Sequence, residues 1–208
     1  MAYPTVSKTY GFKPVNRLDG LPYAGAIRQL PIASDYNTPI YNGDIVRIAA
    51  GGTIAKSDVT VDSTTAAANY TAGVFVGVQY VNTQGQTVQA QYYPGNAAAS
   101  SAIAYVVMDP VAEFKVAVTY SGNSTVTTTT TAAVGVNAAL IQGTGSSTTG
   151  DSGVSVAQPA SGAGNAAALP VRIVAVVPET ATGANAFTEV IVKFNNPQIL
   201  LAAGNDFA

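Results

Sequence analysis

The sequence predicts an all-β protein, either an antiparallel β-barrel or a β-sandwich, with an extended N-terminal arm and long polar loops. Short runs rich in Val, Ile, Phe and Tyr recur along the chain, and turn signals containing Gly, Pro, Asn or Asp separate them. No stretch of about ten residues keeps the 3.6-residue period of an amphipathic helix. Strand order cannot be inferred from these patterns, so both architectures stay open.

Residues 1–39 predict the extended arm. Their prolines remove backbone donors and bias the preceding residues toward extended conformations, and they stand at positions 4, 14, 22, 31 and 39. The arm either wraps its own domain or docks on a neighbouring subunit, where aromatic and Arg side chains are the usual anchors. The candidate contact residues of the second alternative are Tyr3, Tyr10, Phe12, Arg17, Tyr23 and Arg28.

A β-rich domain over residues 40–196 follows the arm. Residues 45–48 form a first strand after a Tyr-Asn-Gly-Asp turn, and residues 53–72, rich in Thr, Ala, Ser and Asp, form a surface excursion. Residues 73–81 form a buried strand, whose glycines indicate a bulge or the close approach of another backbone. Residues 87–92 alternate, with Val88 and Ala90 on one face.

The second half of the domain continues the pattern. We expect strands at residues 103–108, 114–119, 154–156, 171–177 and 189–194. Residues 134–141 fit either a short strand or one helical turn. Residues 121–131 resemble a long polar strand or loop, and residues 143–167 are a polar loop region. The domain could divide into two small subdomains near residues 143–167, and residues 197–208 form a C-terminal tail.

Asp109 and Glu113 raise the question of catalysis, because they lie four residues apart in VVMDPVAEFKVAV. A pair of carboxylates is the machinery of glycosidases, but such a site usually also has aromatic platforms for the sugar, and the chain has no Trp. Asp-Pro instead favours a bend between two strands. We therefore expect Asp109 to organise a bend, and Glu113 and Lys115 to lie on the outer face, opposite Phe114. Val116 and Val118 then fill the core beside Phe114.

The composition excludes most catalytic and binding chemistry. The absence of Cys and His removes thiol nucleophiles, Ser-His-Asp triads and His/Cys zinc sites. The net charge is −2, and no basic stripe is present, which argues against nucleic-acid and membrane partners. Asp58 and Asp62 lack the spacing of a calcium loop. The sequence thus predicts no enzyme activity, no metal and no cofactor.

Arg172 is unusual because it interrupts the apolar run of residues 171–177. It either faces solvent on the outer side of its strand or pairs with a carboxylate across a subunit interface, since a buried charge requires a partner.

Several segments carry a family resemblance, in this order: GFKPVNRLDGLPYAGAIRQLPI, YNGDIVRI, AGVFVGVQY, QAQYYPG, AYVVMDPVAEFKV, AAVGVNAAL, TGDSGVSV, LPVRIVAVV and VIVKFNN. Together they resemble the head decoration, or cement, proteins of tailed bacteriophages, of the type found in aquatic phages. The likeness covers residues 11–196 and rests on the order and character of the segments rather than on one diagnostic motif.

The resemblance implies a viral structural protein on the outer surface of the capsid. Such a protein binds the major capsid protein shell and stabilises the head, and it associates with itself, with a trimer favoured. Its N-terminal arm commonly contacts the shell or neighbouring subunits, and it carries no catalytic residues. The alternative function is a phage or cell-surface attachment or fibre domain that binds host glycans. A polysaccharide hydrolase that uses Asp109 and Glu113 is the third and weakest hypothesis.

Overall fold

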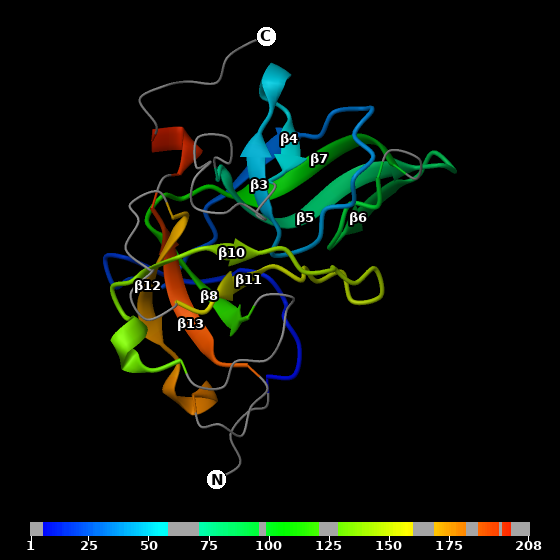
Figure 1. Cartoon of the computed structure of the whole chain (residues 1–208). Helices are drawn as coiled ribbons and strands as arrows, with labels where there is room; N and C mark the ends of the chain where they lie inside the picture. Colours follow the sequence, from blue (N-terminus) through cyan, green and yellow to red (C-terminus); the bar gives the residue numbers. More distant parts are fainter. Residues whose placement is uncertain are drawn as a thin grey trace.

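The structure, a computed structural model, describes residues 6–57, 71–95, 99–120, 129–159, 169–181, 187–195 and 197–200. These residues form two sheets and no α-helix, so the predicted all-β class is confirmed (Figure 1). The strands are β1 (Lys13–Arg17), β2 (Ile27–Pro31), β3 (Ile45–Ile48), β4 (Ile54–Lys56), β5 (Gly73–Asn82), β6 (Thr87–Ala90), β7 (Ala99–Val107), β8 (Ala112–Thr119), β9 (Asn137–Ala138), β10 (Leu140–Ile141), β11 (Ser155–Ala157), β12 (Val171–Val176) and β13 (Glu189–Phe194). The 3-10 turns are η1 (Ala50–Gly52), η4 (Thr131–Ala133), η5 (Pro178–Thr180) and η6 (Gln198–Leu200).

The lower sheet of Figure 1 is barrel-like. Its strand order is β10-β11-β8-β13-β12-β9, and β1 also pairs with β8. Only Ala139 separates β9 from β10, so the two ends of this order lie next to each other in the chain and the sheet nearly closes on itself. The upper sheet has the order β2-β7-β5-β3-β4, with β6 paired to β5. A parallel bridge between Ile32 and Ile54 brings its two margins together.

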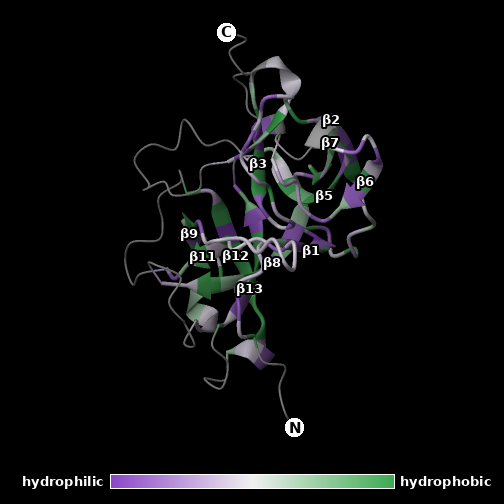
Figure 2. Cartoon of the chain, turned by 90° about the vertical axis from the view of Figure 1, so that its right-hand side faces the viewer, coloured by the Kyte–Doolittle hydropathy of each residue, from purple (hydrophilic) through white to green (hydrophobic). Residues whose placement is uncertain are grey.

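Each sheet surrounds a hydrophobic cluster, and the lower cluster also receives residues from the upper sheet. Phe12, Phe114 and Phe194 pack with ring centroids 5.2–6.1 Å apart in the lower cluster. Ile45 and Val74, which belong to the upper sheet, are buried in this same cluster. Green apolar residues accordingly lie on the strands in Figure 2. The upper sheet thus contributes to the lower cluster. The predicted core positions Phe114, Val116 and Val118 all belong to this lower cluster, which confirms them.

Residues 6–31, here called the N-terminal segment, form part of both sheets. β1 pairs antiparallel with β8, and β2 pairs antiparallel with β7. Phe12 has no exposed surface. In this structure the described part of the predicted arm wraps its own domain, which was the first of the two alternatives.

Residues 42–44, here called the junction, connect the two sheets. Asn42 N–H donates to Gly150 O and Ser152 N–H donates to Asn42 O, which attaches the junction to the chain that leads into β11. On its other side Gly43 N–H donates to Phe75 O of β5. Phe12 N–H donates to Gly43 O at 3.0 Å, so the N-terminal segment meets both sheets at this point.

The Asp44 carboxylate lies at the centre of the junction and is fully buried. It accepts hydrogen bonds from Tyr41 N–H at 2.8 Å and from Ser152 Oγ at 2.5 Å, and Lys56 Nζ lies 2.8 Å from Oδ2. A buried charge is tolerated when it is paired and hydrogen-bonded, and Asp44 satisfies both conditions. One side chain therefore joins β4 of the upper sheet to the residues that precede β11 of the lower sheet.

Gly43 is required at the junction by its backbone conformation and by its neighbours. Its φ of +92° is a region that L side chains rarely adopt. A Cβ atom at this position would also lie 2.8 Å from Phe12 N. The contact between the N-terminal segment and the junction therefore depends on glycine.

Several strands lie where the sequence predicts them, and three do not. The predicted strands at residues 45–48 and 189–194 have the same bounds as β3 and β13. β4 lies inside the predicted surface excursion, and its Ile54 is fully buried, so that part of the prediction is wrong. β1 and β2 form from residues predicted to be an arm, because each finds a partner strand that is distant in sequence. The predicted division near residues 143–167 stays a prediction.

We expect Asp44→Ala to lower the free energy of unfolding by about 3–5 kcal/mol, because it leaves Lys56 and Ser152 without their buried partner. Chemical denaturation measures this loss. Asp151→Ala is the matched control, since its ion pair with Lys13 is one-third exposed on both sides and contributes at most about 1 kcal/mol. Equal losses in the two variants would contradict a special role for the junction.

Gly73→Ala tests the close backbone approach that the sequence predicts. A Cβ at Gly73 would lie 2.1 Å from Val107 O, whereas a Cβ at Gly77 on the same strand would lie 3.3 Å from Ala90 O. We expect Gly73→Ala to cost about 3 kcal/mol and Gly77→Ala clearly less, as measured by denaturation. The expectation fails if the two substitutions cost the same.

Candidate interaction surface

The bend at Asp109-Pro110 connects the two sheets through β7 and β8. Asp109 Oδ1 accepts a hydrogen bond from Val111 N–H at 3.0 Å, and Ala112 N–H donates to Asp109 O at 3.1 Å. The predicted bend, organised by Asp109, is confirmed. Arg17 Nε lies 3.4 Å from Asp109 Oδ2, so this carboxylate pairs with the N-terminal segment.

Glu113 is buried, which corrects the expectation that it lies outside. It follows the bend on β8, faces away from Phe114 as predicted, and is 8% exposed. The N-terminal segment removes it from solvent, because β1 lies alongside β8 with Asn16 in register with Glu113. Burial raises the pKa of Glu113 above its ordinary value. Lys115 is half-buried on the same face.

Tyr10 fastens the beginning of the N-terminal segment to the outer face of the lower sheet. Its hydroxyl donates to Glu189 Oε1 on β13, and Lys115 Nζ on β8 lies 3.2 Å from Glu189 Oε2. Lys115 Nζ also lies 5.8 Å from the centroid of the Tyr10 ring. Burial, then the hydrogen bond to Glu189 and its charge, raise the pKa of Tyr10 well above its ordinary value. Tyr10 is therefore engaged within its own chain.

An open cavity of about 340 Å³, with a mixed polar and apolar lining, lies beside Tyr10. Two carboxylates line it, Asp151 and Glu189, and each forms a salt bridge with a lysine. Because a lysine is paired with each carboxylate, the two do not form a free acid–base pair. The residues that line the cavity are Val6, Ser7, Lys8, Thr9, Tyr10, Thr149, Asp151 and Glu189.

The exposed apolar side chains near β2 form the second feature of this region. Leu18, Leu21 and Ile27 are 51%, 56% and 47% exposed. Ile103 on β7 is 38% exposed and is an immediate neighbour of Pro31, its register partner on β2. A single exposed Leu is ordinary, whereas several large exposed apolar side chains on neighbouring segments are typical of an interaction site. We call these four residues, with Tyr23 and Arg28, the β2 surface.

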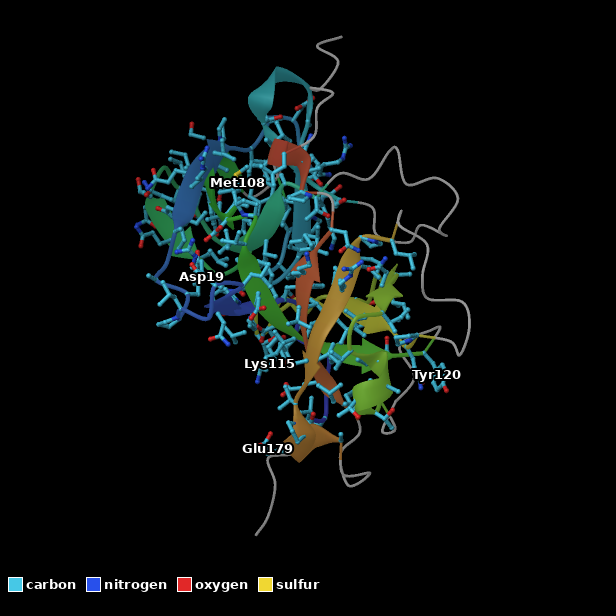
Figure 3. All side chains as sticks on the ribbon, turned by 90° about the vertical axis from the view of Figure 1, so that its left-hand side faces the viewer. Asp19, Met108, Lys115, Tyr120 and Glu179 are labelled. Carbon is cyan, nitrogen blue, oxygen red and sulfur yellow. The ribbon has the colours of Figure 1, made fainter. Side chains whose placement is uncertain are left out.

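The chain around β2 holds these side chains in place. Leu18 N–H donates to Val111 O and Tyr23 N–H donates to Val15 O, so the loop before β2 is attached to the bend and to β1. β2 ends its sheet at one margin (Figure 2). Asp19, in the same loop, lies at one margin of the molecule in Figure 3, and Tyr120 lies at the opposite margin.

The predicted contact residues separate into three groups. Arg28 is exposed and Tyr23 is half-buried, with its hydroxyl bonded to Ala26 O, and both belong to the β2 surface. Tyr10 and Arg17 are half-buried and bonded to acidic residues of the same chain. Phe12 is in the core, so we do not include it in any contact surface. Tyr3 lies outside the described residues, as do Asp58 and Asp62.

The exposed leucines at positions 18 and 21 were not among the residues expected from the sequence. They lie in LDGLP, where Gly and Pro indicate a turn. An apolar residue on each side of such a turn was the signal that could have identified them as exposed apolar side chains. Arg172 is exposed on β12, which agrees with the solvent-facing alternative.

Within the described ranges, no cluster of three or more acidic side chains is arranged to hold a metal ion. No helix among the same residues is long and apolar enough to cross a membrane.

Comparison with models of protein families, with curated proteins and with solved structures found no match for this chain.

Glu113→Gln tests the environment of the buried carboxyl group. Because the pKa of Glu113 is raised on folding, its ionisation disfavours the folded state, and this penalty sets in as the pH rises above the ordinary pKa of a Glu side chain. We expect the variant to have a higher thermal midpoint than the wild type at neutral pH. The difference should vanish below pH 4.5, the ordinary pKa of a Glu side chain, where both states of the wild type are protonated. Glu179→Gln, at an exposed position, controls for the change in net charge.

Proposed function

We propose that this chain is a head decoration protein of a tailed bacteriophage, which binds the outer surface of the major capsid protein shell and stabilises the head. The resemblance in the order of segments supports this function, and the all-β fold agrees with it. The observation that carries the proposal furthest is the β2 surface, where four large apolar side chains are exposed on β2, on the loop before it and on the paired strand β7. Apolar and aromatic residues with an Arg are the usual anchors of a protein–protein contact.

The composition suits a protein that packs densely on a shell. Only 10% of the residues are charged, against about 25% in ordinary soluble proteins, so neighbouring copies repel each other little. A shell offers many equivalent binding sites, so that modest contacts summed over many copies can resist the internal pressure of the genome. The protein would act by adding contact area between capsid subunits, without catalysis or a cofactor.

The proposed partners are the major capsid protein and further copies of the chain itself, with a trimer favoured by the resemblance. Nucleic acid and membrane are not among them, because the chain shows no basic stripe. The place of action would be the outer surface of the virion.

A second function has its own observation, namely the cavity beside Tyr10. The hydroxyl and carboxylate groups that line this cavity are suited to hydrogen bonds with sugar hydroxyl groups. Such a site is expected of an attachment or fibre domain that binds host glycans. Binding of the isolated protein to glycans would favour this function.

The copy number in purified virions tests the decoration function. We expect a number of copies close to that of the major capsid protein, measured by quantitative protein staining or mass spectrometry. A few copies per particle would exclude decoration and would favour an attachment role.

Substitutions on the β2 surface test which face makes the contact. We expect Leu21→Lys combined with Ile27→Lys to reduce attachment to shells that lack the protein by about tenfold or more, measured by cosedimentation. Both side chains are about half exposed, so the fold should be retained. Val134→Lys, at a position 45% exposed on the chain between β8 and β9, is the matched control. Deleting residues 1–39 is unsuitable, because the deletion would remove β1 and β2.

A further inference from the structure

Two cations lie next to each other on the outer face of the lower sheet. Arg172 on β12 and Lys193 on β13 are register partners in the antiparallel pair, so their side chains leave the same face of the sheet. Arg172 is exposed and Lys193 is half-buried. Like charges directly opposite each other destabilise a sheet. Their position therefore calls for an explanation.

No described salt bridge joins this pair to an acidic side chain. The described salt bridges join Lys13, Arg17, Lys56 and Lys115 to carboxylates, and none of them involves Arg172 or Lys193. A chain with so few charged residues thus places two of its nine basic side chains together without an acidic partner in the described part of the structure.

The guanidinium of Arg172 is held in position by two side-chain amides, of which Asn137 is buried. Arg172 Nε donates to Asn137 Oδ1 at 3.0 Å, and Asn137 is 6% exposed. Asn195 Nδ2 donates to the same oxygen at 3.1 Å and to Leu169 O at 2.8 Å, which fixes the amide that receives Arg172. Because only Nε is bonded, the two Nη groups remain available for a bidentate contact with a carboxylate.

We propose that Arg172 and Lys193 form a docking site for a carboxylate side chain of the major capsid protein. This inference rests on the proposed function and names a charged contact separate from the β2 surface. Side chains opposite each other in a sheet are about 5 Å apart, so the Arg fork and the Lys ammonium can reach one carboxylate together. Removing the repulsion between the two cations would then favour binding.

The chemistry selects a protein partner over the other anions. Nucleic acid requires a stripe of basic residues, commonly about six to ten phosphate contacts, and two cations do not supply it. The cavity beside Tyr10 is lined by other residues and includes neither Arg172 nor Lys193. The half-buried Ile191, next to Lys193 on the outer face of β13, offers an apolar neighbour for a protein surface.

The experiment compares attachment and stability in the same variants. We expect Arg172→Gln and Lys193→Gln each to weaken cosedimentation with shells by about tenfold or more, because truncating one side of a paired contact is costly. Attachment of Arg172→Lys, which keeps the charge and loses the guanidinium fork, should be intermediate between that of the Gln variants and that of the wild type. Wild-type attachment should weaken with added salt more steeply than attachment of the double Gln variant.

The free protein provides the second measurement. Lys193→Gln should leave the thermal midpoint unchanged or raise it, because it removes a like-charge contact. Arg47→Gln, an exposed Arg on β3, is the matched control and should change neither attachment nor stability.

The outcomes separate the inference from the proposed function. If the wild type attaches to shells and the double variant attaches equally well, the docking site is wrong and the proposed function stands. If Lys193→Gln destabilises the free protein, a carboxylate of the same chain occupies the site, and the inference is overturned. A wild type that does not attach to shells overturns both.

Discussion

The buried carboxylate of Asp44 is the interaction on which the rest of the structure depends. A charged group that is buried away from solvent must have hydrogen-bonding or ionic partners. The partners of Asp44 are Tyr41, Lys56 and Ser152, which come from three parts of the chain. Meeting this requirement holds β4 of the upper sheet and the approach to β11 of the lower sheet at the same point. The flanking backbone adds Phe12 and Phe75 to this arrangement.

This junction explains why the N-terminal segment belongs to the body of the molecule. Phe12 reaches the lower core because its backbone is bonded to Gly43, and Tyr10 then lies on the outer face of β8 and β13. Two parts of the described surface remain distinctive once this segment is in place. One is the apolar β2 surface, and the other is the cationic pair on β12 and β13. We propose that both serve attachment to a shell, through hydrophobic anchoring at the first and charge pairing at the second.

Residues with a local pattern could be interpreted from the sequence, and residues whose partners are distant could not. Alternation predicts β6 and β13, and Asp-Pro predicts the bend between β7 and β8, because these signals act over a few neighbours. Lys13–Arg17 contains a proline and two cations and becomes a strand only because β8 offers it an edge. The face of the sheet predicted for Glu113 is correct, but its predicted exposure is wrong, since burial depends on what packs against that face. The exposed leucines of the candidate surface were missed for the same reason.

The sequence by itself determined the all-β class, the main strands, the bend at Asp109 and the absence of the residue types needed for thiol, imidazole and zinc chemistry. Only the tertiary structure decided which sheet each strand joins, that the N-terminal segment is internal to the fold, and that Arg172 stands beside Lys193. The physical reason is that backbone propensity and side-chain alternation are local properties. Strand pairing, burial and the meeting of charges depend on contacts between residues that lie far apart in the chain.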